Sequence, residues 1–203
     1  MQKIALSTGN KDKIKELARL VDPDRFQLFS KDDLGLADLE VEETGETLRE
    51  NADLKVKGLA QALKDAGQDP DEYWILADDT GLFVDALDGA PGVYSARYAG
   101  EHVTYDDNVD KLLVAMEGVE EADRGAHFST VIALLDHGTI HEYEGRLEGH
   151  ILTERRGHGG FGYDPIFFAD EAGKTLAELG PEEKNAISHR GRAYRAFLEA
   201  VHG

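Results

Sequence analysis

Cysteine is absent from this 203-residue chain, and so are long hydrophobic runs. Without cysteine the protein has neither disulfides nor thiolate metal sites. No apolar stretch approaches the roughly 20 residues that span a bilayer, so we expect no membrane partner. The first residues, MQKI, do not resemble a secretory signal, and we therefore expect a cytoplasmic protein.

Basic residues are also scarce. The chain has 22 Lys and Arg against 41 Asp and Glu, which gives a formal net charge of -19 at pH 7. A nucleic-acid binder needs a basic stripe to neutralise phosphates, so the composition argues against a nucleic-acid partner. The acidic residues are scattered and not gathered into a tail. Such scatter is typical of the solvated acidic surface of a protein adapted to high salt, and we expect a halophilic protein.

The length fits a single domain, residues 1–203, without an internal repeat or a low-complexity linker. Apolar runs and helical periodicity alternate along it. Strands are expected at residues 3–7, 26–29, 73–77, 126–135, 139–149 and 166–169, and helices at 11–21, from 47 to Gly67, from Thr104 to Met116 and from Pro181 onward. The turn at 136–138 predicts an antiparallel hairpin among these βα units, so the sheet is expected to be mixed.

Two adjacent carboxylates, Asp78 and Asp79, follow the apolar run 73–77. We expect the strand to end here, against a turn at Thr80-Gly81, where ligands bind in open α/β sheets. Since side chains alternate along a strand, at most one carboxylate continues the buried face, and the other is expected to point into a cleft. Adjacent acids at a turn bind a divalent cation or share a proton. A solvated Asp-Asp turn is the commoner arrangement in an acidic protein.

Among the few basic residues, Lys13 and Lys55 are candidates for a functional role. The turn at residues 8–10 precedes the helix 11–21, and its backbone N–H groups face an anion site at the helix N-terminus. Lys13 lies in the first turn, where a cation is unfavourable unless an anion is present, although an ordinary surface lysine is equally consistent. In the next helix, which starts with a capping box at Thr47 and Glu50, Asn51 and Lys55 share a face. An ordinary solvated lysine is the favoured interpretation of Lys55.

The segment 157–165 contains G-x-G-x-x-G but leads into a strand-like run and not a helix. We therefore reject a dinucleotide-binding motif. A glycine loop with one aromatic residue lets a planar base approach the backbone and stack on Phe161. A flexible loop with Phe161 in the core is equally consistent. The helix from Pro181 carries Lys184, His189 and Arg190, a basic group that stands out in so acidic a chain.

Five separated blocks of sequence combine these features: STGNKDK (7–13), EETGETLRENADLK (42–55), ILADDTGLFVDALDGAPGVYSARYAG (75–100), GGFGYDPIF (159–167) and EEKNAISHRG (182–191). Together they closely resemble the inosine/xanthosine triphosphate pyrophosphatase family, whose members hydrolyse non-standard purine nucleoside triphosphates. The resemblance implies an α/β fold with a mixed twisted sheet, flanking helices and two lobes around a central cleft. It also implies a homodimer and a magnesium-dependent reaction of ITP, dITP or XTP with water to give the monophosphate and pyrophosphate.

The resemblance also assigns roles by position. Asp79 matches the general base, and Thr80 stands where serine is common but keeps the hydroxyl. The phosphate-binding residues are implied to be Thr8, Gly9, Asn10, Lys11, Asp12, Lys13 and Lys55. The metal cluster is implied to be Glu42, Glu43, Asp78 and Asp79, with Mg²⁺ as the cation. The purine pocket is implied to be Phe161, Gly162, Tyr163, Asp164, Lys184, His189 and Arg190. At Asn185 serine is frequent, and this departure disturbs no implied role.

Two other functions remain as alternatives. Asp79-Thr80-Gly81 is also the active-site triplet of aspartic proteases, but a dimer would have to supply the second copy. Asp78 before the triplet and the helix-rich remainder argue against this alternative. A non-catalytic module that binds divalent cations would explain the four acids but not Lys184, His189 and Arg190.

Overall fold

A computed structural model describes residues 1–202, apart from the side chain of His202, and the chain divides into two compact units. Unit 1 comprises Met1–Asp79, Thr130–Glu144 and Ala193–Gly203, and unit 2 comprises Thr80–Ser129 and Gly145–Arg192. No helix within residues 1–202 has the length and apolar character needed to cross a membrane.

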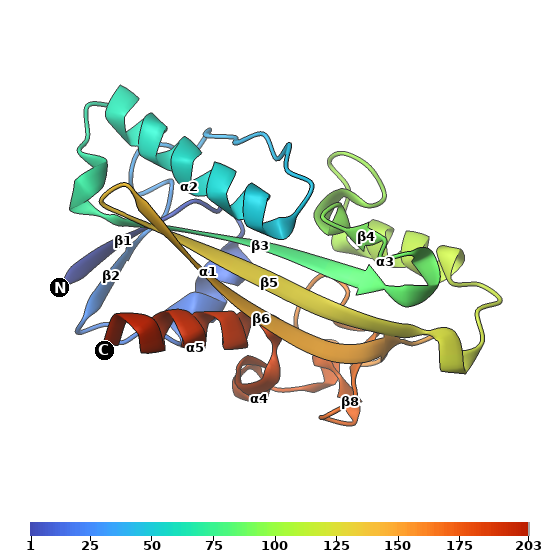
Figure 1. The fold of residues 1–203 in the computed structure, drawn as a ribbon. Coiled ribbons are helices and arrows are strands. Elements are labelled where there is room, and N and C mark those ends of the chain that lie inside the picture. The colour runs from blue at the N-terminus through green and yellow to red at the C-terminus, as the bar shows by residue number, and fades with distance from the viewer. Residues whose placement is uncertain (203) are drawn as a thin grey trace. The chain divides into compact units, whose positions relative to one another are not determined.

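Unit 1 contains β1, α1, β2 and α2, and unit 2 contains β4, α3, β7, β8 and α4, while β3, β5, β6 and α5 contribute residues to both (Figure 1). Their bounds are β1 (Gln2–Leu6), α1 (Lys11–Ala18), β2 (Phe26–Phe29), α2 (Leu48–Asp65), β3 (Trp74–Val84), β4 (Pro91–Gly92), α3 (Tyr105–Ala115), β5 (Gly125–Asp136), β6 (Thr139–Ile151), β7 (Phe167–Ala169), β8 (Lys174–Thr175), α4 (Pro181–Ile187) and α5 (His189–His202).

The strands form a mixed sheet, as predicted. Within the described residues their order is β2-β1-β3-β5-β6-β7-β8, with β4 paired to β3. β1 runs parallel to β2 and to β3, whereas the pairs β3–β4, β6–β7 and β7–β8 are antiparallel.

In unit 1, helices cover both faces of the strands (Figure 1). Leu17 of α1 and Phe197 of α5 pack with Ile4, Leu6 and Leu76 in one buried cluster. On the opposite face lies α2, whose predicted apolar stripe is buried as expected: Leu48, Ala52, Val56, Leu59 and Leu63. Unit 2 has its own core, in which α3 packs against the strands through Val109, Leu112 and its C-cap residue Met116.

The predicted capping box is confirmed, because Thr47 with Glu50 caps α2. The predicted helix start at Thr104 is confirmed as well, and Thr104 forms a second capping box with Asp107 on α3. The predicted hairpin is confirmed as well, with positive φ at His137 (45°) and Gly138 (83°) between β5 and β6.

The predicted turn at Thr80-Gly81 is wrong, because β3 continues through these residues to Val84. A glycine is required at position 81 because the backbone of β4 comes close to it, and not because the chain turns there. A Cβ at this position would lie 2.7 Å from the carbonyl oxygen of Gly92 in β4. The pairing of Leu82 with Gly92 keeps β3 extended past the two carboxylates.

Two predicted helices also have different bounds. α1 ends at Ala18 and does not reach Val21, because turn hydrogen bonds follow it, one of them from Leu20 N–H to the Leu17 carbonyl. The helix from Pro181 is two helices. Ser188 between α4 and α5 is extended (φ -63°, ψ 153°), and its hydroxyl accepts the Gly191 N–H at 3.0 Å as an N-cap for α5.

Candidate functional site

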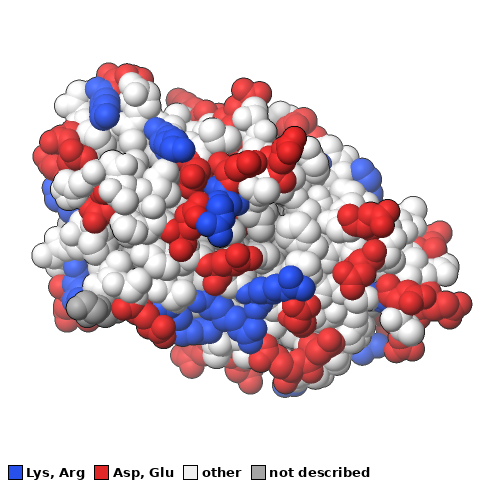
Figure 2. All heavy atoms as spheres, viewed as in Figure 1, with Lys and Arg blue, Asp and Glu red and all other residues white. Residues whose placement is uncertain are grey.

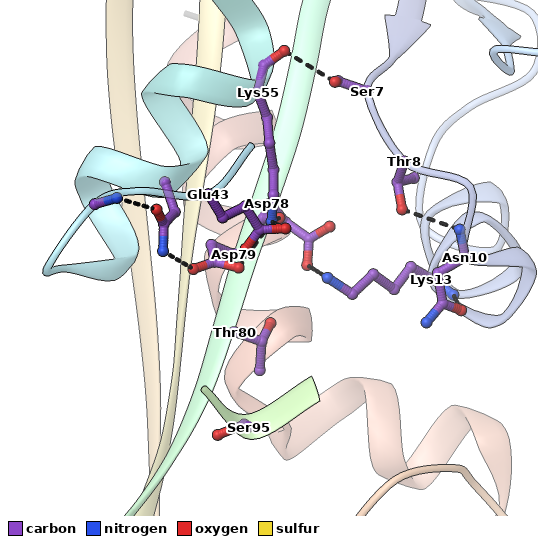
Figure 3. Close-up of polar contacts among 12 residues, drawn as sticks. Ser7, Thr8, Asn10, Lys13, Glu43, Lys55, Asp78, Asp79, Thr80 and Ser95 are labelled. Carbon is purple, nitrogen blue, oxygen red and sulfur yellow. Dashed lines mark hydrogen bonds and ion pairs between the residues drawn. The ribbon is translucent and has the colours of Figure 1, made fainter. Parts of the chain in front are cut away.

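Asp78 and Asp79 are both buried, with 3% and 6% of their surface exposed. The expectation that at most one of them would lie on a buried face of the strand is therefore wrong. Successive side chains of β3 point to opposite faces, and in unit 1 each face is covered by a helix that supplies a lysine. Lys13 Nζ of α1 lies 2.8 Å from Asp78 Oδ2, and Lys55 Nζ of α2 lies 2.8 Å from Asp79 Oδ1 (Figure 3). Two opposite lysines allow both acids to be buried.

The turn before α1 is ordered by its own side chains. Asn10 is the N-cap, and its Oδ1 accepts the N–H groups of Asp12 at 2.9 Å and Lys13 at 3.3 Å. Thr8 Oγ1 in turn accepts the N–H of Asn10 at 3.1 Å. Gly9 and Lys11 are exposed. Lys13, a cation in the first helical turn, is thus balanced by the Asp78 carboxylate.

Lys55 is nearly buried and is not the solvated lysine favoured from the sequence. It contacts Glu43 Oε1 at 3.3 Å and donates to the backbone carbonyl of Asp78 at 3.2 Å, in addition to its bond with Asp79. Burial lowers the pKa of Lys55, but Asp79, Glu43 and Asp78 attract its charge more strongly, and the pKa is raised. Lys55 is therefore cationic at neutral pH. Glu42, unlike Glu43, is exposed.

Burial raises the pKa of Asp79, and the neighbouring Lys55 offsets only part of that increase. The two shifts oppose each other, since a raised Lys55 pKa favours the ion pair and a raised Asp79 pKa disfavours it. Because the cationic Lys55 lies 2.8 Å from Asp79 Oδ1, we expect Asp79 to be ionised at neutral pH. A carboxylate with a raised pKa accepts a proton more readily than an ordinary one, which suits a general base.

The acidic residues of this cluster suit a hard cation without enclosing one. Among the side chains that the structure describes, those of residues 1–201, no three Asp, Glu or His converge closely enough to hold a metal ion by themselves. Mg²⁺ typically uses one or two carboxylates together with waters and substrate phosphates. Any one or two of the carboxylates of Glu43, Asp78 and Asp79 fit that mode of binding, but the predicted cluster of four acids that includes the exposed Glu42 is not assembled in the described part of the chain.

In unit 2, Asp164 ties together two residues of the predicted purine pocket. Lys184 Nζ lies 2.7 Å from Asp164 Oδ2, and the same oxygen accepts the Phe161 N–H at 2.9 Å. The Phe161 ring lies over Lys184 Nζ (4.5 Å to the centroid) and the Arg190 guanidinium (5.3 Å). Gly160 permits this loop, because a Cβ there would be 2.0 Å from Asp164 Oδ2.

The remaining residues of the predicted pocket differ in their surroundings. Arg190 Nη2 donates to Thr80 Oγ1 at 3.1 Å. The buried His189 ring stacks on Phe128 at 4.4 Å. Tyr163 is buried in the core and donates to the backbone carbonyl of Ser95 at 2.7 Å, and burial strongly raises its pKa. Gly162 has a positive φ of 63° in the same loop. Unit 2 therefore gathers Phe161, Asp164, Lys184, Arg190 and Thr80, whereas Tyr163 supports the loop from within the core.

The sequence interpretation assigned no site role to Asn51. This residue is fully buried, with Nδ2 3.4 Å from Asp79 Oδ2 and Oδ1 accepting the Gly45 N–H at 2.8 Å. The only signal in the sequence was a polar residue one helical turn before Lys55 and next to the buried stripe of α2.

Comparison with known proteins identifies the family of the chain. A sequence model of the Ham1 family matches residues 4–200. The chain belongs to the Ham1 family. It is 47% identical over 191 residues to the dITP/XTP pyrophosphatase of Thermoanaerobacter sp. (strain X514), covering 94% of this chain and 92% of that protein. It is 46% identical over 201 residues to the dITP/XTP pyrophosphatase of Caldanaerobacter subterraneus subsp. tengcongensis, covering 99% and 96%.

Solved structures of Ham1 proteins show the same fold. The HAM1 protein from Coxiella burnetii superposes with a TM-score of 0.85 at 38% identity, covering 99% of this chain and 98% of that one. The Staphylococcus aureus Ham1 protein superposes with a TM-score of 0.83 at 38% identity, covering 98% and 100%. The predicted α/β fold class is thereby confirmed.

Proposed function

We propose that the protein is a nucleoside triphosphate pyrophosphatase that hydrolyses ITP, dITP and XTP to the monophosphate and pyrophosphate, cleansing the nucleotide pool. The observation that carries this proposal is on β3, where Asp79 is held by Lys55 and the next residue, Thr80, is held by Arg190. In unit 1 a charged acid-lysine cluster therefore surrounds Asp79, and in unit 2 a cationic aromatic cluster contacts Thr80, the next residue of the same strand. The similarity to dITP/XTP pyrophosphatases over nearly the whole chain supports the same substrate class.

The cluster of unit 1 is assigned to the triphosphate. Lys13 and Lys55 neutralise phosphate charge together with the turn at residues 8–12. One or two of the carboxylates Glu42, Glu43, Asp78 and Asp79 would hold Mg²⁺ together with the substrate phosphates. When bound, this cation supplies further neutralisation of the phosphate oxygens. Asp79 accepts a proton from the attacking water. The water oxygen bonds to phosphorus, and the anhydride bond between the α- and β-phosphates breaks.

The cluster of unit 2 is assigned to the purine. Lys184 and Arg190 carry only donors, which match the 6-oxygen of hypoxanthine or xanthine and leave donors unmatched against the amine of adenine. Phe161 offers a stacking surface, which adds affinity but does not distinguish one base from another. His189 supplies a further donor through a ring nitrogen, and Asp164 holds Lys184 in place.

We further propose a cytoplasmic homodimer with a surface adapted to high salt. The dimer is implied by the family resemblance. The acidic surface is visible in Figure 2, where Asp and Glu side chains are spread over the face shown.

The aspartic protease alternative is disfavoured by the surroundings of its triplet. Asp79-Thr80-Gly81 lies inside β3, and Asp79 pairs with a lysine. An aspartic protease instead needs two carboxylates that share one proton.

A nucleotide panel tests the proposed function. The purified protein is incubated with Mg²⁺ and ITP, dITP, XTP, GTP or ATP, and monophosphate and pyrophosphate are quantified, with EDTA as the metal-free control. We expect ITP and XTP to be hydrolysed far faster than ATP, with GTP between them, and no turnover in EDTA. Release of diphosphate and inorganic phosphate, or no turnover at all, would contradict the proposal. A cation-binding module would bind Mg²⁺ without turnover.

A further inference from the structure

Asn51 is a polar side chain with no exposed surface, placed on α2 among the residues that pack that helix. A buried amide is costly unless its groups are hydrogen-bonded. Asn51 Oδ1 accepts the N–H of Gly45 at 2.8 Å, and Nδ2 lies 3.4 Å from Asp79 Oδ2. One side chain therefore bridges the segment before α2 and the carboxylate on β3.

Lys55, one helical turn after Asn51, bonds the other oxygen of the same carboxylate. Its Nζ lies 2.8 Å from Asp79 Oδ1 (Figure 3). Two residues on one face of α2 therefore hold Asp79 by both oxygens. The terminal torsion of an aspartate is broad when nothing restrains it. Bonds to both oxygens fix the plane of the carboxylate, and with it the direction in which its lone pairs point.

The same pair also fixes the loop that carries Glu43. Lys55 contacts Glu43 Oε1 at 3.3 Å, and Asn51 holds the backbone two residues later, at Gly45. This approach is so close that a Cβ on Gly45 would lie 2.6 Å from Asn51 Oδ1. A glycine is therefore required opposite the Asn51 amide.

We propose that Asn51 is a positioning residue, which orients the Asp79 carboxylate and holds the segment 43–45 beside it. Asn51 acts through Asp79 and does not touch the substrate. This role rests on the proposed function, in which Asp79 accepts the proton of the attacking water.

A double-mutant cycle tests the role. Asn51→Ala is measured in the wild type and in Asp79→Asn, with kcat and KM for ITP and the thermal midpoint as readouts. In the wild type we expect kcat to fall about 10- to 100-fold with little change in KM, because small misplacements of a catalytic group are costly. In the Asp79→Asn background the same change should cost nothing further in kcat, because the group it orients is already inactive.

Asn108 provides a matched control. It is also a buried asparagine that bridges a helix and a loop, but its partners are backbone groups only, the N–H of Ala99 at 2.7 Å and the carbonyl of Ala96 at 3.1 Å. Asn108→Ala should lower the thermal midpoint while kcat stays near the wild-type value. If Asn51→Ala does not fold, Asn51→Ser enters the same cycle.

The outcomes separate this role from the proposed function. Independent, multiplicative losses of kcat in the cycle would overturn the positioning role of Asn51 while leaving the pyrophosphatase intact. The positioning role is also overturned if Asn51→Ala changes only the thermal midpoint, as Asn108→Ala should. Wild-type protein that releases no pyrophosphate from ITP would overturn the proposed function, and the role of Asn51 with it.

Discussion

Asp78 and Asp79 are consecutive in β3 and therefore lie on opposite faces of the strand. Both are buried, each against a lysine of a different helix. Burying a charge is expensive unless a partner of opposite sign accompanies it. Lys13 of α1 and Lys55 of α2 supply those partners. These two pairs therefore place two acids against two cations before any substrate arrives, and the residues of each pair depend on each other.

Asp79→Asn tests the proposed base. The amide keeps the shape of the carboxylate but cannot take a proton from water. We expect kcat for ITP to fall on the order of 10² to 10⁴, with KM largely unchanged. Steady-state kinetics with pyrophosphate detection measures both quantities. A near-normal kcat would transfer the base role to Asp78 or Glu43.

Lys13→Met tests the predicted phosphate contact. Loss of a charged hydrogen bond to phosphate should raise KM for ITP about 10- to 100-fold. The same change leaves the buried Asp78 without its lysine, so the free energy of unfolding should fall by about 3–5 kcal/mol. Lys15→Met, an exposed lysine of the same helix, should change neither quantity appreciably. An unchanged KM in folded Lys13→Met would show that Lys13 serves stability alone.

Local signals in the sequence were sufficient for much of the fold. The capping boxes at Thr47 and Thr104 and the hairpin at residues 136–138 act over a few residues, so a single sequence shows them. The failures depend on distant contacts. The sequence suggested a turn at Gly81. The glycine is instead needed because it leaves room for the carbonyl of Gly92, and this contact with another strand is not visible in the local sequence.

Only part of the site could be predicted from the residue patterns alone, without the family resemblance. Its residue assignments came from the family resemblance, and their roles are still predictions. The sequence did not predict that Asp78 and Asp79 are both buried, because their lysines come from two other helices. Asn51 was placed on the face of Lys55, but its bond to Asp79 depends on how α2 lies on β3.

Arg190→Ala tests base recognition. Sites built to hydrogen-bond a substrate group reject an analogue that lacks it by roughly 10⁴-fold. If Arg190 reads the 6-oxygen, kcat/KM for ITP should fall much more than the residual value for ATP. Arg192→Ala is the control, because this arginine of α5 bonds the Arg146 carbonyl and Glu171. Equal losses on ITP and ATP would show that Arg190 holds phosphate or structure and does not read the base.

Asp107 should make the stability of α3 depend on pH. Hydrogen bonds from the backbone N–H and the hydroxyl of Thr104 lower the pKa of Asp107. Because its pKa is lower in the folded than in the unfolded protein, the ionised Asp107 carboxylate stabilises the fold fully above the unfolded pKa of about 3.9. This stabilisation is lost as the pH falls through the folded pKa. Asp107→Ala should therefore lower the thermal midpoint at pH 7. The difference in thermal midpoint between this variant and the wild type should become smaller below about pH 4. Asp106→Ala, in the same turn, should lower the thermal midpoint at pH 7 by less. If the difference between Asp107→Ala and the wild type does not change with pH, the pH-dependent role of Asp107 is contradicted.

Salt should raise the stability of the protein. The net charge of -19 is carried by acids dispersed over the surface, so their mutual repulsion opposes the compact state at low ionic strength (Figure 2). Because the Debye length falls from about 10 Å at 0.1 M to about 3 Å at 1 M, KCl should relieve this repulsion. The thermal midpoint should rise from low salt to molar KCl. A variant with Asp38→Asn and Glu40→Gln, two exposed acids, should start from a higher midpoint at low salt and gain less from KCl. A flat or falling midpoint in the wild type would remove the proposed adaptation to high salt.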